Sequence, residues 1–238
     1  MCGGLSSGDA VVFGTACQIV SQCVRFCRER RREKQIEGYL VPQLGTLLQR
    51  LREGGKSVLN VMGALAVLQE LVAVEGGVFF GRIGEEVEEK GALRAVAELL
   101  AVPQSNKLEE MRKIEGSNYG IHPVGMYDPA FLFLHRLLVR TQKESPKRME
   151  ELLRGVRESK VQGRLAGVVV GLSSKVDLSP RGLISLLMVV YDVVSEGIGD
   201  EFAEEGLLGA LVGLLGEEQV EALGEWPVGL GGGEVLVG

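Results

Sequence analysis

The cysteines of this chain are the first candidates for redox chemistry, metal binding or acylation. Three of the four cysteines, Cys17, Cys23 and Cys27, recur at intervals of six and four residues in one amphipathic segment. This spacing matches neither a CxxC redox pair nor a zinc site, and only two histidines are present to complete one. The pattern predicts reduced thiols that pack as small apolar residues. Cys2, in the opening MCGG, could be acylated, but no second membrane signal accompanies it.

The other polar residues also lack a catalytic arrangement. His122 lies in an irregular stretch and His135 in a leucine-rich one, and neither has a nucleophile spaced beside it. The glycines from Gly231 to Gly233 lack the Lys-Ser/Thr of a phosphate-binding loop and indicate a flexible linker. Four glutamates form a run that is typical of a solvated helix face: Glu85, Glu86, Glu88 and Glu89. We therefore expect no catalytic, cofactor-binding or metal-binding residues.

The candidate partner-binding residues are cationic or aromatic. Arg30, Arg31 and Arg32 lie at the end of a predicted helix over 9–34, where the helix dipole favours cations. They form either a solvated helix end or a patch for an acidic partner such as a microtubule. Trp226, the only tryptophan, is either an anchor packed on the last helical hairpin or a binding hot spot.

A stretch with three of the seven prolines interrupts the helical pattern from Val102 to Pro129. A connection of this length in a compact protein is usually either functional or disordered. Because Tyr119, Met126 and Tyr127 lie in it, we predict a loop folded back onto the helices. Partner binding by Tyr119 and Tyr127 is the alternative.

The composition is that of a chain that folds. Apolar residues make up 45% of the 238 residues and charged residues 24%, which permits a sizeable core. The net charge of -6 disfavours binding to nucleic acid. The amino terminus lacks the features of a secretory signal, and no apolar run approaches 18 residues, so no transmembrane helix is indicated. We expect a cytoplasmic location.

Apolar periodicity predicts helices in the first half of the chain. In the helix over 9–34, the expected buried face consists of Val12, Ala16, Ile19, Val20, Cys23 and Cys27. A second helix is predicted from Tyr39 to Arg52, with Pro42 in its first turn. The next segment, from Lys56 to Val74, is apolar on nearly all sides and predicts a buried inner helix.

Three helix starts in the second half share one device. Asp128–Pro129, Ser145–Pro146 and Ser179–Pro180 each place an N-cap side chain before a proline at the first helical position. No segment shows the alternation of a strand, so the predicted class is all-α. We predict helical halves over 1–102 and 130–224, an irregular loop over 103–129, and a Gly-rich tail over 225–238.

Two segments resemble each other and the final helix of an armadillo unit, in which an acidic residue and a glycine precede a leucine-rich helix. One is EEVEEKGALRAVAELL, ending at Leu100, and the other is EFAEEGLLGALVGLL, ending at Leu215. Their glycines, Gly91 and Gly206, are 206 - 91 = 115 residues apart, which is not a clean multiple of a repeat of about 40 residues. The second copy belongs to a predicted helical hairpin from Leu178 to Gly216. The resemblance implies an irregular armadillo/HEAT-like α-solenoid.

Three segments in order resemble the carboxyl-terminal armadillo region of Fused-type serine/threonine kinases, including the plant Two-in-One form. They are YGIHPVGMYDPAFLFLHRLL from Tyr119, LSPRGLISLLMVVYDVVSEG from Leu178, and WPVGLGGG from Trp226. The resemblance covers about residues 118–238. The family pattern continues into another helix beyond Gly233, so we expect the tail to be truncated. The chain has no VAIK, HRD or DFG kinase motif, so the resemblance concerns the non-catalytic region.

The resemblance implies a function in protein assembly. Fused-type proteins join a kinase domain to helical repeats that engage kinesin-related or other scaffold partners, in Hedgehog signalling, motile cilia or plant cytokinesis. We therefore expect a protein-binding scaffold with microtubule or kinesin-related partners and an association with the cytoskeleton or cilium. The alternatives are a segment that regulates a kinase domain in cis, and an armadillo adaptor unrelated to kinases.

Overall fold

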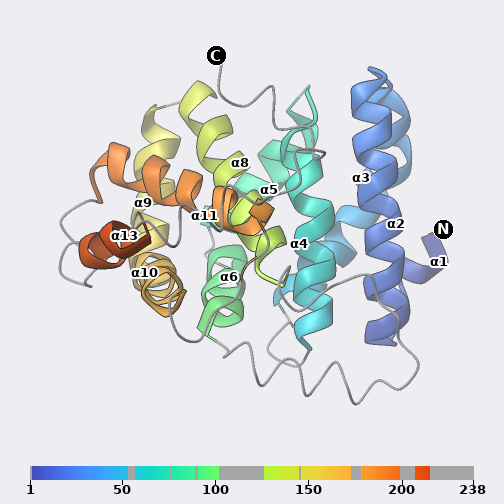
Figure 1. Cartoon of the computed structure of the whole chain (residues 1–238). Helices are drawn as coiled ribbons and strands as arrows, with labels where there is room; N and C mark the ends of the chain where they lie inside the picture. Colours follow the sequence, from blue (N-terminus) through green and yellow to red (C-terminus); the bar gives the residue numbers. More distant parts are fainter. Residues whose placement is uncertain are drawn as a thin grey trace.

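The structure is a computed structural model that describes residues 2–52, 57–75, 77–88, 91–101, 126–144, 146–172, 178, 180–198 and 207–214. Within these ranges every regular element is a helix and no strand occurs (Figure 1). The predicted all-α class is therefore confirmed.

The first four helices form the amino-terminal end of the molecule. They are α1 (Cys2–Leu5), α2 (Ala10–Glu29), α3 (Glu33–Arg52) and α4 (Val58–Val72). Asp9 caps α2, because its Oδ1 accepts hydrogen bonds from the backbone amides of Val11 at 2.8 Å and Val12 at 3.2 Å. Arg31 lies in the left-handed region with φ 53°, which lets the chain reverse between α2 and α3. As predicted, α4 is buried along nearly its whole length.

The remaining helices complete the fold in chain order. They are α5 (Val78–Glu88), α6 (Gly91–Ala101), α8 (Asp128–Glu144), α9 (Pro146–Glu158), α10 (Val161–Gly171), α11 (Pro180–Val193) with the π-helical turn η3 (Val194–Ile198), and α13 (Leu207–Leu214). As predicted, α9 begins at Pro146 and α11 at Pro180, whereas α8 begins at Asp128, one residue before Pro129. Ser145 and Ser179 lie outside the described residues. The two leucine-rich segments form α6 and α13, although Val212 of α13 is 62% exposed.

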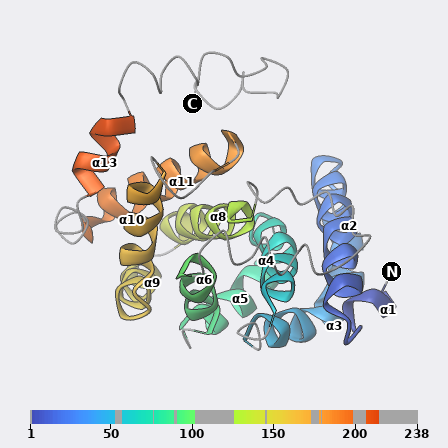
Figure 2. The same cartoon turned by 60° about the horizontal axis from the view of Figure 1, so that its bottom comes forward.

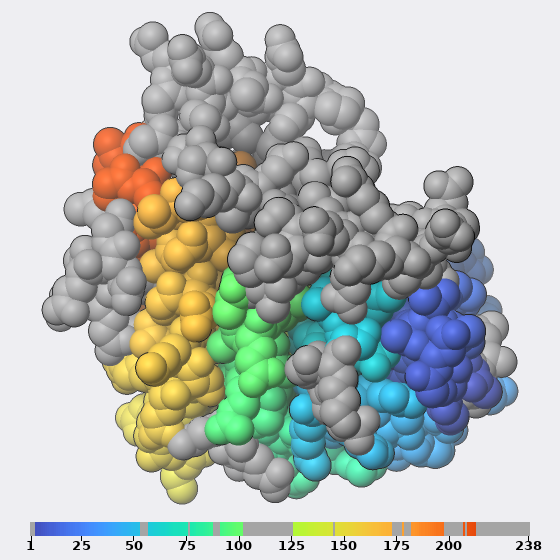
Figure 3. Space-filling view, turned by 90° about the horizontal axis from the view of Figure 1, so that it is seen from below, coloured from blue at the N-terminus to red at the C-terminus, as the bar shows by residue number. Residues whose placement is uncertain are grey.

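The helices lie in rows. In one row α2 contacts α4, α4 contacts α8, and α8 contacts α11 (Figure 2). In a second row α3 contacts α6, α6 contacts α10, and α10 contacts α13. Contacts of α5 and α9 with each other and with these rows complete the arrangement. The surface follows the same order, from the blue amino-terminal helices to the yellow helices α9 and α10 (Figure 3). Helices are therefore added along one direction as the chain proceeds.

One continuous apolar core joins these rows. Phe13, Leu65, Phe131 and Leu165, from four different helices, are each fully buried in it. α2 and α4 approach each other closely, because a Cβ on Gly63 would be 3.2 Å from the Cβ of Cys17 and 3.3 Å from the Cα of Gly14. These two helices can pack this closely because glycine occupies the contact on both sides.

The prediction for α3 was wrong at its start. The helix begins at Glu33, six residues before Tyr39, so Pro42 lies inside it and not in its first turn. Proline leaves the carbonyl of Gly38 without its usual helical donor. Both Gly38 and Pro42 are exposed, so water can occupy that position.

The predicted buried face of α2 was wrong in part: Val20 is buried, and Ala16 and Cys27 pack against the core. The residues buried in α2 include Phe13, Cys17, Val20 and Val24, whereas Val12 and Ile19 are exposed. Of Cys17, Cys23 and Cys27, only Cys17 is buried; Cys27 is half-buried and Cys23 is exposed. Apolar residues cover more than one side of this helix, so periodicity alone could not identify the side that meets the core.

Burial of Cys17 predicts a loss of stability in alkaline solution. Burial raises the pKa of its thiol to about 12, so the neutral form stabilises the fold below the ordinary pKa of about 8.5. This stabilisation is lost as the pH rises from there towards 12, by about 1.4 kcal/mol per pH unit. When urea denaturation is measured at pH 8.5 and at pH 10, the free energy of unfolding should fall between the two by about 1–2 kcal/mol less for the Cys17→Ala variant than for the unmodified chain. Equal losses in both chains would contradict the assignment.

Candidate protein-interaction surface

An apolar stripe runs along the outer side of α2. Val12, Ile19 and Phe26 are spaced seven residues apart, which places them on one side of a helix. They are 47%, 49% and 48% exposed, respectively. Three large apolar side chains aligned over this length form a patch, unlike the single apolar residues that are common on protein surfaces.

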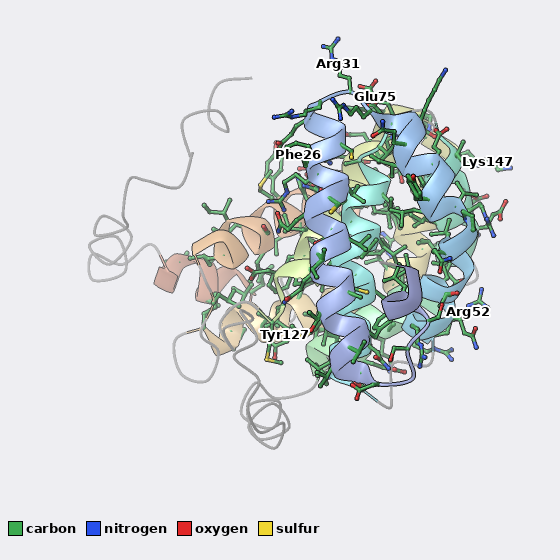
Figure 4. All side chains as sticks on the ribbon, turned by 90° about the vertical axis from the view of Figure 1, so that its right-hand side faces the viewer. Phe26, Arg31, Arg52, Glu75, Tyr127 and Lys147 are labelled. Atoms are coloured by element: carbon green, nitrogen blue, oxygen red, sulfur yellow. The ribbon has the colours of Figure 1, made fainter. Side chains whose placement is uncertain are left out.

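A groove between α2 and α3 adjoins this stripe. It encloses about 330 Å³, which is near the lower end of the range for ligand pockets, about 300–1,000 Å³. Its lining is nearly all apolar and comes from α1 (Leu5), α2 (Val20, Cys23, Val24, Cys27) and α3 (Gln35, Ile36, Tyr39, Leu40). The side of the molecule that carries α1, α2 and α3 faces the viewer in Figure 4.

The corner between α2 and α3 is strongly cationic. Arg30, Arg31 and Arg32 are exposed there, and the guanidinium carbon of Arg30 lies 4.2 Å from the centre of the Phe26 ring. Phe26 and Arg31 lie towards the same end of α2 (Figure 4). No carboxylate of the described residues forms an ion pair with these three arginines. The predicted cationic patch is thus next to the apolar stripe.

A buried ion cluster holds α2 in place. Glu70 of α4 is fully buried, and its Oε1 accepts hydrogen bonds from Arg25 Nη2 at 2.9 Å and Arg25 Nε at 3.1 Å. Its Oε2 lies 3.0 Å from Arg136 Nη1 on α8 and 3.2 Å from Arg28 Nη2 on α2. Burial acts to raise the pKa of Glu70, but the charges and hydrogen bonds of Arg136 and Arg25 hold this pKa below its usual value. One carboxylate therefore joins three helices of the row.

Polar contacts also join α8 to the end of the row. His135 Nδ1 lies 2.7 Å from Asp192 Oδ2 on α11, and Gln142 Nε2 donates to Glu196 Oε1 of η3 at 2.8 Å. His135 therefore joins α8 to α11 through an ion pair or a hydrogen bond. The outer side of α11 carries a second exposed apolar stripe of Ile184, Leu187 and Tyr191, and exposed Val194 of η3 follows it.

Tyr127, another predicted binding residue, does not join this surface. Tyr127 precedes α8 and is 2% exposed, with its ring centre 6.0 Å from that of Phe131. Its burial, which raises the pKa of its phenol, agrees with a residue folded onto the helices and not with a surface contact. Tyr119 and Trp226 lie outside the described residues, as do His122 and Gly231 to Gly233.

One residue of the predicted solvated acidic face is buried. Glu86 is 2% exposed and forms two hydrogen bonds with Arg52 of α3, one of them 2.6 Å long to Nε. A Cβ at Gly91 would overlap this carboxylate, so glycine at the start of α6 leaves room for the pair. Glu85, by contrast, is exposed as predicted.

α2 is long and apolar enough, by length and composition, to cross a membrane, and it is the one helix of the described residues that meets this test. From the sequence no transmembrane helix is indicated, because no apolar run approaches 18 residues, and a single helix that passes this test is weak evidence for a membrane span. Core helices of soluble proteins and amino-terminal signal sequences pass the same test. In the structure α2 packs along α4 and pairs Arg25 with the buried Glu70.

The described residues contain no group of three His, Cys, Asp or Glu side chains that could hold a metal ion. No protein-family model, curated protein or solved structure matches the chain. The resemblance to Fused-type kinases therefore stays a prediction.

Proposed function

We propose that this chain is an irregular armadillo/HEAT-like α-solenoid and acts as a non-catalytic scaffold that binds other proteins. The order of contacts supports this proposal, because successive helices extend the two rows from α2 to α11 and from α3 to α13. The single observation that carries the binding role is the exposed apolar stripe beside the cationic corner of α2. A patch of this kind, rimmed by charged groups, is typical of an interaction site.

The partner class rests on the three segments that resemble the Fused-type region. On that basis we propose that the chain corresponds to the carboxyl-terminal region of a Fused-like serine/threonine kinase and acts with microtubule or kinesin-related partners in the cytoplasm. The cationic corner supports this choice, because microtubule surfaces are acidic and attract exposed arginines. A segment acting in cis on a kinase domain, and an armadillo adaptor unrelated to kinases, are the alternatives.

Sedimentation with stabilised microtubules tests this proposal directly. A triple variant with Arg30→Glu, Arg31→Glu and Arg32→Glu should sediment much less than the unmodified chain at low salt, because each reversal replaces an attraction with a repulsion. A second triple variant with Arg94→Glu, Arg154→Glu and Arg164→Glu, at exposed positions on α6, α9 and α10, has the same change of charge, so it serves as the matched control and should retain binding. Equal sedimentation of the triple variant and the control would contradict a role for the corner.

Purification of the chain alone and joined to the kinase domain separates the scaffold from the cis-acting alternative. Retention of kinesin-related proteins by the chain alone, identified by mass spectrometry, supports the scaffold. If these proteins are retained only when the kinase domain is present, the cis-acting segment is favoured.

A further inference from the structure

We propose that the groove between α2 and α3 binds an amphipathic helix of a partner protein, with carboxylates at the helix end that reaches Arg30, Arg31 and Arg32. This inference rests on the proposed scaffold function and adds the location and chemistry of one binding site.

The spacing of the lining residues fits a helix. On α2 the groove is lined by Val20, Cys23, Val24 and Cys27, at relative positions 0, 3, 4 and 7. On α3 it is lined by Ile36, Tyr39 and Leu40, at positions 0, 3 and 4. Helices pack on one another through rows of residues with these intervals. From Val20 to Cys27 the groove follows about 10 Å of helix, or two turns, which suits apolar side chains at positions i, i+3 or i+4, and i+7 of an occupant.

The chain itself places a helical leucine in this groove. α1 contacts both α2 and α3, and its Leu5 is 1% exposed among the lining residues. α1 is only four residues long, and about 330 Å³ of the groove remains open beside Leu5. An occupant that supplies further apolar side chains would therefore repeat a contact that this surface already makes.

The apolar surface is longer than the groove, which favours a helix over a single acyl chain. From Val12 to Phe26 the exposed stripe follows about 21 Å of α2, and exposed Cys23 connects it to the groove. An acyl chain within the groove would leave Val12, Ile19 and Phe26 in water. A helix with a broad apolar face can cover the groove and the stripe together.

The cationic corner sets the charge and direction of the occupant. The sequence from Arg28 to Lys34 contains five cations against Glu29 and Glu33. Arg28 forms an ion pair with Glu70, whereas Arg30 lies over the Phe26 ring at the end of the stripe. Carboxylates near one end of the occupant would meet these guanidinium groups, which favours one direction of binding and rejects a cationic helix.

A display library of helical peptides, selected against the intact chain, tests the proposal. The selected peptides should carry apolar residues at i, i+3 or i+4, and i+7, with carboxylates near one end. Their dissociation constants are then measured by fluorescence anisotropy with labelled synthetic peptides. Cys23→Arg places a charge in the groove at an exposed position and should weaken binding about tenfold or more. The pair Arg31→Glu and Arg32→Glu should weaken it severalfold and reduce its salt dependence.

Two controls keep the result specific to the groove. Tyr191→Arg, at a position 73% exposed on α11, should leave affinity unchanged. Bound peptide should also slow alkylation of Cys23 in the unmodified chain, which locates the peptide independently of any variant. Circular dichroism and thermal unfolding confirm that each variant remains folded.

Several outcomes would overturn the proposal. The first is that no peptide is enriched. The second is that the peptides bind the Cys23→Arg variant as tightly as the unmodified chain, and the third is that only the Tyr191→Arg variant binds them more weakly. Binding of dansyl-undecanoic acid in the groove that no selected peptide displaces would indicate an acyl ligand instead. If Cys23→Arg retains the same protein partners as the unmodified chain, the groove is rejected while the scaffold function stands.

Discussion

The Glu70→Gln variant should unfold with a free energy about 3–5 kcal/mol lower than that of the unmodified chain at pH 7. The substitution keeps the volume of the side chain but removes the one charge among the described residues that compensates Arg25, Arg28 and Arg136 at this point. Arg136 is itself largely buried, so its charge cannot be fully hydrated when Glu70 is neutral. Urea denaturation followed by circular dichroism measures the difference.

The difference should depend on pH in a defined direction. Because the folded pKa of Glu70 is lowered, the ionised form stabilises the fold above the unfolded pKa of about 4.3. This stabilisation is lost as the pH falls through the folded pKa, so Glu70→Gln and the unmodified chain should converge in acid. Glu98→Gln, at an exposed position on α6, is the matched control and should change stability by less than about 0.5 kcal/mol. A similar loss for both variants at pH 7 would contradict the role of the cluster.

The Tyr127→Ala variant should also lower the free energy of unfolding by about 3–5 kcal/mol. Tyr127 fixes the start of α8 in the core, where its ring contacts Phe131, and removing it leaves a cavity between buried neighbours. Thermal and urea unfolding measure the loss.

An exposed tyrosine provides the comparison for this effect. Tyr191 of α11 is 73% exposed, and Tyr191→Ala should change stability by less than about 0.5 kcal/mol. If Tyr127→Ala were as stable as Tyr191→Ala but lost partner binding, Tyr127 would be a contact residue and not a core residue.

The helix boundaries that proline or glycine determines could be predicted from the sequence. Pro146 and Pro180 begin α9 and α11, and Gly91 begins α6, because their backbone preferences are local. The burial of α4 could also be predicted, because a helix that is apolar on all sides must be enclosed.

Features that depend on distant residues could not be predicted in the same way. Glu70 meets Arg25 from 45 residues away, and Glu86 meets Arg52 from 34 residues away. Neither pair leaves a periodic signal in the sequence. A run of glutamates therefore suggested a solvated face, although the fold buries one member of it.

The candidate surface was only partly predictable. Arg30, Arg31 and Arg32 were visible as a charge cluster at a helix end. Their apolar neighbours Val12 and Ile19 were assigned to the core, because a helix with two apolar sides does not reveal which side its partners will cover. The buried side of α2 is determined by its packing on α4, where Gly63 lies against Gly14 and Cys17.

Among the described residues, α2 and α11 are the outermost helices of the row α2, α4, α8 and α11, and each has an exposed apolar stripe. If one copy docked its α11 on the α2 of another, each pair would still have one free edge of each kind, so such association would grow as a filament and not close as a dimer. The net charge of -6 opposes this growth through mutual repulsion. Solubility of the free chain should therefore decrease as salt screens that charge.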